Sequence, residues 1–265
     1  IPVYGTKKGK IVFKQWLDIE ECDSTFTVQR KEVDKIILNL KNEVPEYNLR
    51  NNWKKLTGFF PNNRPVKFVF MKDLEDPYYN QILYVPTISY NFYDGLTPGI
   101  RLHNKTILDK PFIFEINPSY SSKSDNLSGS AIFVINQNYR NNTLYNAKYS
   151  MSGSYFHYAQ DATYLKLNPT VQLRIRQPNF RDNRKQLILF RQVIVNKEKS
   201  AFVTENSPEN YSVFDARYIN TRTEVTNHFN FSSNIQVSGD FGKVIGELEY
   251  RKLFENNRQI NLRFY

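Results

Sequence analysis

Apolar and polar residues alternate with a period of two along much of the chain. Between residues 165 and 176 the odd positions hold Leu, Leu, Pro, Val, Leu and Ile, and the even positions hold Lys, Asn, Thr, Gln, Arg and Arg. The same alternation runs through residues 145–155, 229–241 and 259–264. Because successive side chains of a strand point to opposite faces of its sheet, this period predicts strands with one apolar and one polar face.

Short turn signals separate these alternating stretches. They combine Gly, Pro, Asn, Asp and Ser, the residues that favour tight turns. They lie at residues 94–95, 109–111, 124–126, 141–142, 179–183, 207–208, 239–242 and 256–257. Runs of about 9 to 13 residues joined by such turns predict an antiparallel meander of about ten or eleven strands.

The first 57 residues have a different pattern. We expect strands at Lys10–Asp18, Ser24–Arg30 and Val33–Lys41, and a short helix within Leu49–Leu56. Gly, Pro and Asn cluster between residues 57 and 65, which marks a domain boundary. The predicted domains are therefore residues 1–57 and residues 58–265.

Two all-β architectures fit a meander with one apolar and one polar face. In a soluble sandwich the apolar face meets a second sheet, and strands are commonly about 5 to 6 residues long. In a transmembrane β-barrel the apolar face meets lipid, strands have about 9 to 11 residues, and aromatic side chains gather at the membrane interfaces. The run lengths favour the barrel, as do the aromatic residues at 90–93, 155–158 and 264–265. The sandwich stays open as the alternative.

Composition narrows the class of protein. The 265 residues contain 36 Lys and Arg against 26 Asp and Glu, a formal net charge of +10, and 40% of the residues are apolar. Such a chain can bury a core, so a disordered tail is excluded. The 20 Phe and 18 Tyr, against six Ala, favour strands over helices. The longest apolar run, Ala131–Ile135, is far shorter than the roughly 20 residues of a membrane-spanning helix.

The single cysteine and the two chain ends carry less information. Cys22 has no second cysteine with which to form an intrachain disulfide, so it leaves the redox compartment open. The chain begins at Ile1 without a methionine and stops at Tyr265 within an alternating stretch. We therefore expect a piece of a longer protein.

Six segments of the chain resemble one family of peptidases. Residues 42–53, NEVPEYNLRNNW, resemble the stretch that closes the β-sandwich after the catalytic domain in aminopeptidase-N-type gluzincin metallopeptidases. Five more segments resemble the C-terminal extension of such peptidases in Gram-negative Bacteroidota: residues 68–80 (FVFMKDLEDPYYN), 90–99 (YNFYDGLTPG), 102–112, 153–159 (GSYFHYA) and 249–254 (EYRKLF). The resemblance covers nearly the whole chain.

This resemblance implies a fold and a location. It implies that residues 1–57 are the end of an accessory β-sandwich and that residues 58–265 are the greater part of a β-barrel. The location implied is the outer membrane of a Gram-negative bacterium, with outer-membrane lipid as a partner. The stretch ends before such a barrel should close, and lipid does not tolerate unpaired strand edges, so we expect that it does not insert alone.

The resemblance also implies an activity that these residues do not carry. Zinc-dependent peptide hydrolysis in this family needs the motif H-E-x-x-H, and His103, His157 and His228 lie too far apart in sequence to form it. We therefore assign no catalytic, cofactor-binding or metal-binding residue. Zinc and the peptide substrate would bind a missing upstream domain, which this chain would anchor. The alternatives are a non-enzymatic outer-membrane channel or assembly subunit with a degenerate peptidase-like region, and a soluble β-sandwich binding module.

Several residues could carry chemistry, and each has a plainer interpretation. His157 and Asp161 could form a proton relay, but a histidine of the interfacial aromatic belt is favoured. Glu247 and Glu249 could act as an acid–base pair. Because they share one strand face with Arg251, they favour a charged ladder against a neighbouring strand.

Acidic, hydroxyl and thiol groups elsewhere also favour structural roles. Asp73, Glu75 and Asp76 could bind calcium, but no D-x-[DN]-x-[DN]-G loop surrounds them, so we expect a solvated turn. Cys22 lies between Glu21 and Asp23, which disfavour a thiolate, so no nucleophile is expected there. Five serines lack a G-x-S-x-G context and predict the polar face of two strands: Ser128, Ser130, Ser150, Ser152 and Ser154.

Five cations lie within one strand end and the turn after it: Arg174, Arg176, Arg181, Arg184 and Lys185. Such a patch could contact the phosphates of nucleic acid. No glycine-rich phosphate loop, zinc-finger spacing or RNP-type motif accompanies it, so we do not expect nucleic acid as a partner. On a barrel these cations would suit a polar lumen or the anionic headgroups at the rim.

Overall fold

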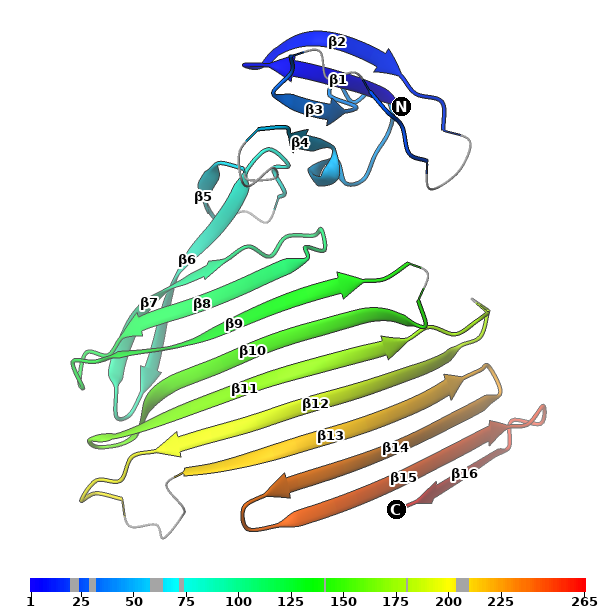
Figure 1. Ribbon diagram of the computed structural model, residues 1–265. Coiled ribbons are helices and arrows are strands. Elements are labelled where there is room, and N and C mark those ends of the chain that lie inside the picture. The colour runs from blue at the N-terminus through cyan, green and yellow to red at the C-terminus, as the bar shows by residue number, and fades with distance from the viewer. Residues whose placement is uncertain are drawn as a thin grey trace. The chain divides into compact units, whose positions relative to one another are not determined.

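The computed structural model describes residues 1–19, 24–28, 32–57, 64–71, 74–140, 142–179, 181–203 and 210–265 (Figure 1). The chain divides into two compact units. The first unit contains Ile1–Ile82 with Thr106–Leu108, and the second contains Leu83–Lys105 with Asp109–Tyr265. This division runs through a strand, and the domain boundary expected at residues 57–65 stays a prediction.

The first unit contains a four-stranded antiparallel sheet in the order β2-β1-β3-β4. Its strands are β1 (Pro2–Lys7), β2 (Lys10–Trp16), β3 (Lys35–Leu38) and β4 (Trp53–Lys55). A 3-10 helix, η1 (Leu49–Asn51), precedes β4, and a further strand, β5 (Val66–Phe70), follows it. No helix in the described part of the chain has the length and apolar character needed to cross a membrane.

The sequence predicts this first unit only in part. Strands β2 and β3 lie inside the stretches predicted for them, but the helix expected within Leu49–Leu56 is a single 3-10 turn. The strand expected at Ser24–Arg30 is wrong for residues 24–28, and residues 29 and 30 lie outside the described chain. Strand β1 has no alternating pattern because its first five residues are all buried, so a period of two could not identify it.

The core of the first unit forms on β1, the strand between β2 and β3. Val3 and Tyr4 are only 2% and 1% exposed. The Tyr4 hydroxyl donates a hydrogen bond of 2.9 Å to Glu43, whose carboxylate also pairs with Lys14 at 2.8 Å. Gly5 lies directly beneath the ring of Phe13, where a side chain would collide with the ring. The small sheet therefore buries the apolar residues of β1 within its own unit, whereas Ile11, Val12 and Trp16 of β2 are exposed.

The large sheet has twelve strands that follow one another in chain order from β5 to β16 (Figure 1). Its strands after β5 are β6 (Asn80–Asn91), β7 (Gly95–His103), β8 (Phe112–Tyr120), β9 (Leu127–Asn138), β10 (Leu144–Ala159), β11 (Ala162–Ile175), β12 (Arg184–Lys197), β13 (Asn210–Thr223), β14 (Asn227–Ser238), β15 (Gly242–Leu253) and β16 (Gln259–Phe264). The predicted all-β antiparallel meander is confirmed, with twelve strands where the sequence predicts about ten or eleven. The predicted turn at 207–208, and parts of those at 141–142 and 179–183, lie outside the described residues.

The strand register gives the large sheet two different faces. One row across eight strands, from β8 to β15, is entirely apolar: Phe112, Ile135, Tyr149, Val171, Phe190, Ala216, Ile235 and Val244. We call the face that carries this row the apolar face. The adjacent row on the opposite, polar face becomes polar from β10 onward: Ser150, Thr170, Arg191, Asp215, Gln236 and Lys243. A shift of one residue thus exchanges the two faces completely.

Candidate functional site

The apolar face of the second unit is the largest candidate site. Six of the eight side chains in the row defined above are exposed, and Val171 and Ala216 are half-buried. Val244 at one end is 76% exposed. Phe190 stacks on Phe214 with ring centroids 6.4 Å apart, and both line a groove of about 410 Å³. Folded monomers in water rarely leave a contiguous apolar patch larger than a few hundred Å². This face therefore calls for an apolar environment, either lipid or a second protein surface.

The polar face carries buried and paired charges in its centre. Asp215 on β13 is 1% exposed, and its Oδ2 accepts hydrogen bonds from Asn234 at 3.0 Å and from Gln236 at 2.9 Å. Arg191 and Arg217 approach the same oxygen at 3.5 and 3.9 Å. Three strands, β12, β13 and β14, thus share one carboxylate through side chains on the polar face.

A second ionic group lies on the same face nearer the start of the sheet. Glu115 on β8 accepts from Arg101 on β7 at 3.0 Å and from Lys105 at 2.6 Å. The Asn117 amide reaches Ser130 on β9 at 3.1 Å. Charged and amide side chains therefore bond across neighbouring strands. Such bonds give the polar side chains of this face their hydrogen-bond partners.

The most specific local geometry is a buried pair formed by Asp94 and His157, which lie 63 residues apart in sequence. Asp94 lies in the turn between β6 and β7, and His157 lies near the end of β10. The ring Nδ1 of His157 is 2.7 Å from Asp94 Oδ1, and the His157 backbone N–H donates to Asp94 Oδ2 at 3.2 Å. Their side chains are only 2% and 6% exposed, so the pair is shielded from water.

Two further side chains complete this cluster. The Asn91 amide donates to Asp94 Oδ2 at 3.0 Å and to the carbonyl of His157 at 2.8 Å. The Ser124 hydroxyl, in the turn between β8 and β9, donates to Asp94 Oδ1 at 3.0 Å. The carboxylate of Asp94 thus joins its own turn to a second turn and to β10.

These contacts determine the charge state of Asp94. Burial raises the pKa of this carboxyl, but hydrogen bonds from the backbone and ring of His157, from Ser124 and from Ser121 lower it. The hydrogen bonds prevail, and the pKa of Asp94 is below its ordinary value of 3.8. Asp94 therefore stays ionised near neutral pH.

The arrangement of the pair limits the chemistry it can perform. His157 lines a cavity of about 520 Å³ together with Lys123, Asp161 and Glu198. Ser124 bonds to the carboxylate and not to the imidazole, so it is not placed as a nucleophile beside a base. Across the described residues, no group of three His, Cys, Asp or Glu side chains is arranged to hold a metal ion. The geometry therefore supports a structural role, in which Asp94 joins the turn after β6 to the turn after β8 and to β10.

His157 therefore has a different partner from the one proposed for a relay. Asp161, its neighbour in sequence, lies in the turn between β10 and β11 with a φ of 52°. The carboxylate that reaches the ring belongs to Asp94, and the burial of His157 does not fit an exposed interfacial belt. Only the Asp-Gly turn signal at residues 94–95 pointed to Asp94, and it indicated a turn and no partner.

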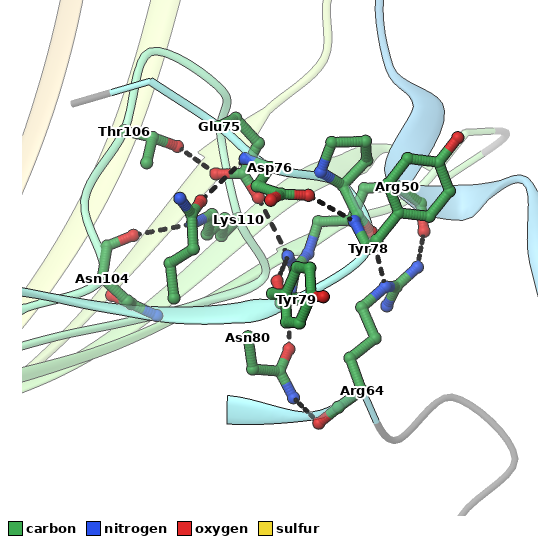
Figure 2. A network of polar contacts seen from close by, with 12 residues as sticks. Arg50, Arg64, Glu75, Asp76, Tyr78, Tyr79, Asn80, Asn104, Thr106 and Lys110 are labelled. Atoms are coloured by element: carbon green, nitrogen blue, oxygen red, sulfur yellow. Dashed lines mark hydrogen bonds and ion pairs between the residues drawn. The ribbon is translucent and has the colours of Figure 1, made fainter. Parts of the chain in front are cut away.

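The first unit contains a polar network of its own, shown in Figure 2. The guanidinium of Arg50 donates to Glu75 at 2.9 Å, to the carbonyl of Tyr79 at 3.0 Å and to the Asn80 side chain at 2.6 Å. Arg64 donates to the carbonyls of Pro77 and Arg50. Two arginines thus tie the segment before β4 to the chain around residues 75–80.

This network corrects one expectation for the acidic cluster. Glu75 is buried because Arg50 and the Thr106 hydroxyl, at 2.7 Å, occupy its two carboxylate oxygens. The solvated turn is therefore wrong for Glu75. Asp76 pairs with the more exposed Lys67 at 3.0 Å, and Asp73 lies outside the described residues.

The remaining candidate residues form side-chain contacts that indicate structural roles. Glu247 pairs with Arg263 of the neighbouring β16 at 2.6 Å, as the charged ladder predicts, and Glu249 lies opposite Arg263 in register. Ser128 bonds to Ser119 across β8 and β9 at 2.9 Å, on the polar face. His228 bonds to Thr223 at 3.0 Å.

Some candidates lie apart from these clusters. His103 is buried on β7. Four of the five clustered cations line one cavity, and Arg181 does not. Cys22 lies outside the described residues.

Comparisons with protein-family models, with curated proteins and with solved structures found no match to this chain.

Proposed function

We propose that the second unit is the greater part of a transmembrane β-barrel that anchors a zinc metallopeptidase in a bacterial outer membrane. The apolar face contacts lipid, and the polar face lines the lumen. The observation that carries this proposal is the apolar row across eight neighbouring strands, exposed on six of them, beside a polar row one residue away. Lipid satisfies such a face, whereas water opposes its exposure by about 25 cal/mol per Å².

Strand length supports the membrane over a soluble sandwich. Strands β6 to β15 contain between 9 and 16 residues. A tilted strand needs about 9 to 11 residues to cross the hydrocarbon layer. Strands of sandwiches are commonly about 5 to 6 residues long.

Aromatic residues at the strand ends support the same proposal. Tyr90 and Phe92 are exposed at the end of β6, and Tyr155 and Phe156 are exposed near the end of β10. Both strands end at turns on the same edge of the meander as the Asp94–His157 pair. Tyrosine and phenylalanine at this level form the interfacial girdle of a membrane barrel.

The peptidase part of the proposal rests on the resemblance of residues 42–53 and of the five later segments to gluzincin metallopeptidases. In this proposal the zinc, the general base and the peptide substrate belong to a domain outside this chain. The chain contributes anchoring, and its histidines contribute no zinc ligand, since their sequence positions lack the H-E-x-x-H spacing.

Spin labels on two adjacent residues of β10 test the membrane placement. Met151 lies on the apolar face, and Ser150 lies on the polar face. In the full-length protein purified from outer membranes, a label at Met151→Cys should be accessible to oxygen, which dissolves in lipid, and not to a water-soluble nickel complex. A label at Ser150→Cys should respond to the nickel complex.

A label at Met151→Cys that neither reagent reaches indicates a sandwich core and rejects the barrel. The activity is tested separately, by assaying aminopeptidase activity of the membrane-bound protein before and after removal of zinc with a chelator. Membrane insertion without zinc-dependent activity would retain the barrel and replace the peptidase anchor with a channel or an assembly subunit.

A further inference from the structure

A cavity of about 770 Å³ lies where β11 ends and β12 begins. Its lining includes Arg174 on β11 and Arg184 and Lys185 on β12. Its volume lies within the roughly 300 to 1,000 Å³ of small-molecule sites. The hairpin therefore encloses a space of ligand size between cations from both of its strands.

Two of the cations that line this cavity lie on one face of the sheet and pair with no carboxylate of the described chain. Arg174 and Lys185 share the polar face and have no ion-pair partner among the described residues, whereas the neighbouring Arg184 points to the opposite face of the sheet. Asp182, a carboxylate in the same lining, accepts the Arg184 backbone N–H at 2.9 Å and faces Arg222 at 4.0 Å. The positive charges of Arg174 and Lys185 repel one another, and an anion that binds between them relieves this repulsion.

The other lining residues show on which face of the sheet the cavity opens. Arg174 lies opposite Leu187 in register, and Leu187 lies opposite Ile219. All three belong to the polar face, and they line the cavity together with Tyr145. A ligand there would have apolar surface against Leu187, Ile219 and Tyr145, and its charge against the cations.

We propose that this cavity binds a small water-soluble organic phosphate. A phosphate monoester carries about −1.5 to −2 charges and three acceptor oxygens, which match the two cations Arg174 and Lys185 better than the single charge of a carboxylate does. Arginine forks bind phosphate oxygens in pairs. Since the cavity lies on the face opposite the apolar row, the ligand comes from water and not from a lipid headgroup. The proposal does not depend on the peptidase.

Calorimetric titration of the full-length protein in a zwitterionic detergent tests the site, with pyrophosphate as the probe. Wild type should bind pyrophosphate, and added salt should weaken the binding. The variants Arg174→Gln and Lys185→Gln should each weaken it by about tenfold or more, because each removes a charged hydrogen-bond donor. Lys243→Gln is the matched control, since Lys243 is an exposed cation on the same polar face outside this cavity.

Three results would overturn the proposal. The first is no heat of binding in wild type. The second is equal weakening by Lys185→Gln and Lys243→Gln, which indicates attraction by net charge alone. The third is binding to vesicles with phosphatidylglycerol but not to pyrophosphate, which assigns the cations to a lipid headgroup. Circular dichroism of each variant separates a lost site from a lost fold.

Discussion

Strand β1 of the small sheet and the strands of the large sheet treat apolar residues in opposite ways. In the four-stranded sheet, Val3 and Tyr4 are almost completely buried, and β1 has neighbours on both sides. In the large sheet, Ile88 and Leu127 are each 70% exposed, although they belong to regular strands. Strand β1 finds its apolar environment within its own unit. The second sheet must find it elsewhere, which is the physical basis for the proposed contact with lipid.

The polar groups differ in a parallel way. In the first unit, Arg50 and Arg64 bond to carbonyl and carboxylate oxygens of loops, and they hold segments without regular pairing. In the large sheet, Asp215 gathers side chains from strands that are already paired by their backbones. Polar side chains therefore shape the loops of the first unit, and on the second they mainly distinguish one face from the other.

The largest effect should come from the buried core of the small sheet. Tyr4→Ala should destabilise the first unit by about 3–5 kcal/mol, since it leaves a cavity and removes a hydrogen bond to Glu43. Limited proteolysis and thermal unfolding of the full-length protein measure this loss. Tyr47→Ala, at a tyrosine that is 77% exposed, should change stability by less than about 0.5 kcal/mol. Equal effects would contradict the buried position of Tyr4.

A charge on the apolar face should have the next largest effect. Met151→Arg should destabilise the protein in lipid vesicles by about 2–4 kcal/mol, as arginine does at the middle of a barrel wall. Ser150→Arg, one residue away on the polar face, should have little effect. Urea unfolding of the two variants in vesicles gives the difference. Similar stability of both variants would show that the two faces do not have different surroundings.

Removal of the buried carboxylate should have a smaller effect. Asp94→Asn should cost about 1–3 kcal/mol, because His157, Asn91 and Ser124 lose a charged acceptor. Asp161→Asn is the control, since Asp161 lies in a turn and has no hydrogen bond to His157. Thermal unfolding should separate these variants, and hydrogen exchange should show faster opening of the β6–β7 turn in Asp94→Asn.

The contribution of Asp94 should also depend on pH. The pKa of this carboxyl is lowered in the folded protein, so its stabilising effect is complete above the ordinary value of 3.8. It should be lost as the pH falls through the lower folded value. The difference in stability between wild type and Asp94→Asn should therefore be constant near neutral pH and shrink in strong acid. A difference that grows in acid would have the wrong sign for this pair.

Much of the large sheet could be predicted from sequence because its signal is local. The alternation at residues 145–155 and 165–176 predicts β10, β11 and their faces, and the turn signals predict sequential antiparallel pairing. The first unit was harder, since β1 is buried on all but one of its residues and lacks alternation. A period of two reports a strand only where its two faces meet different surroundings.

The sequence by itself determined which residues share a face, since neighbours along a strand alternate by the geometry of the backbone. It also indicated the cation cluster around the β11–β12 turn, because both strands of a hairpin are close in sequence. Only the tertiary structure decided that Asp94 meets His157 and that Arg50 meets Glu75. These pairs join segments 63 and 25 residues apart, and their contact depends on how turns and loops fold over one another. No local sequence pattern predicts these contacts, because hydrogen bonds between side chains far apart in sequence form only after the backbone has brought them together.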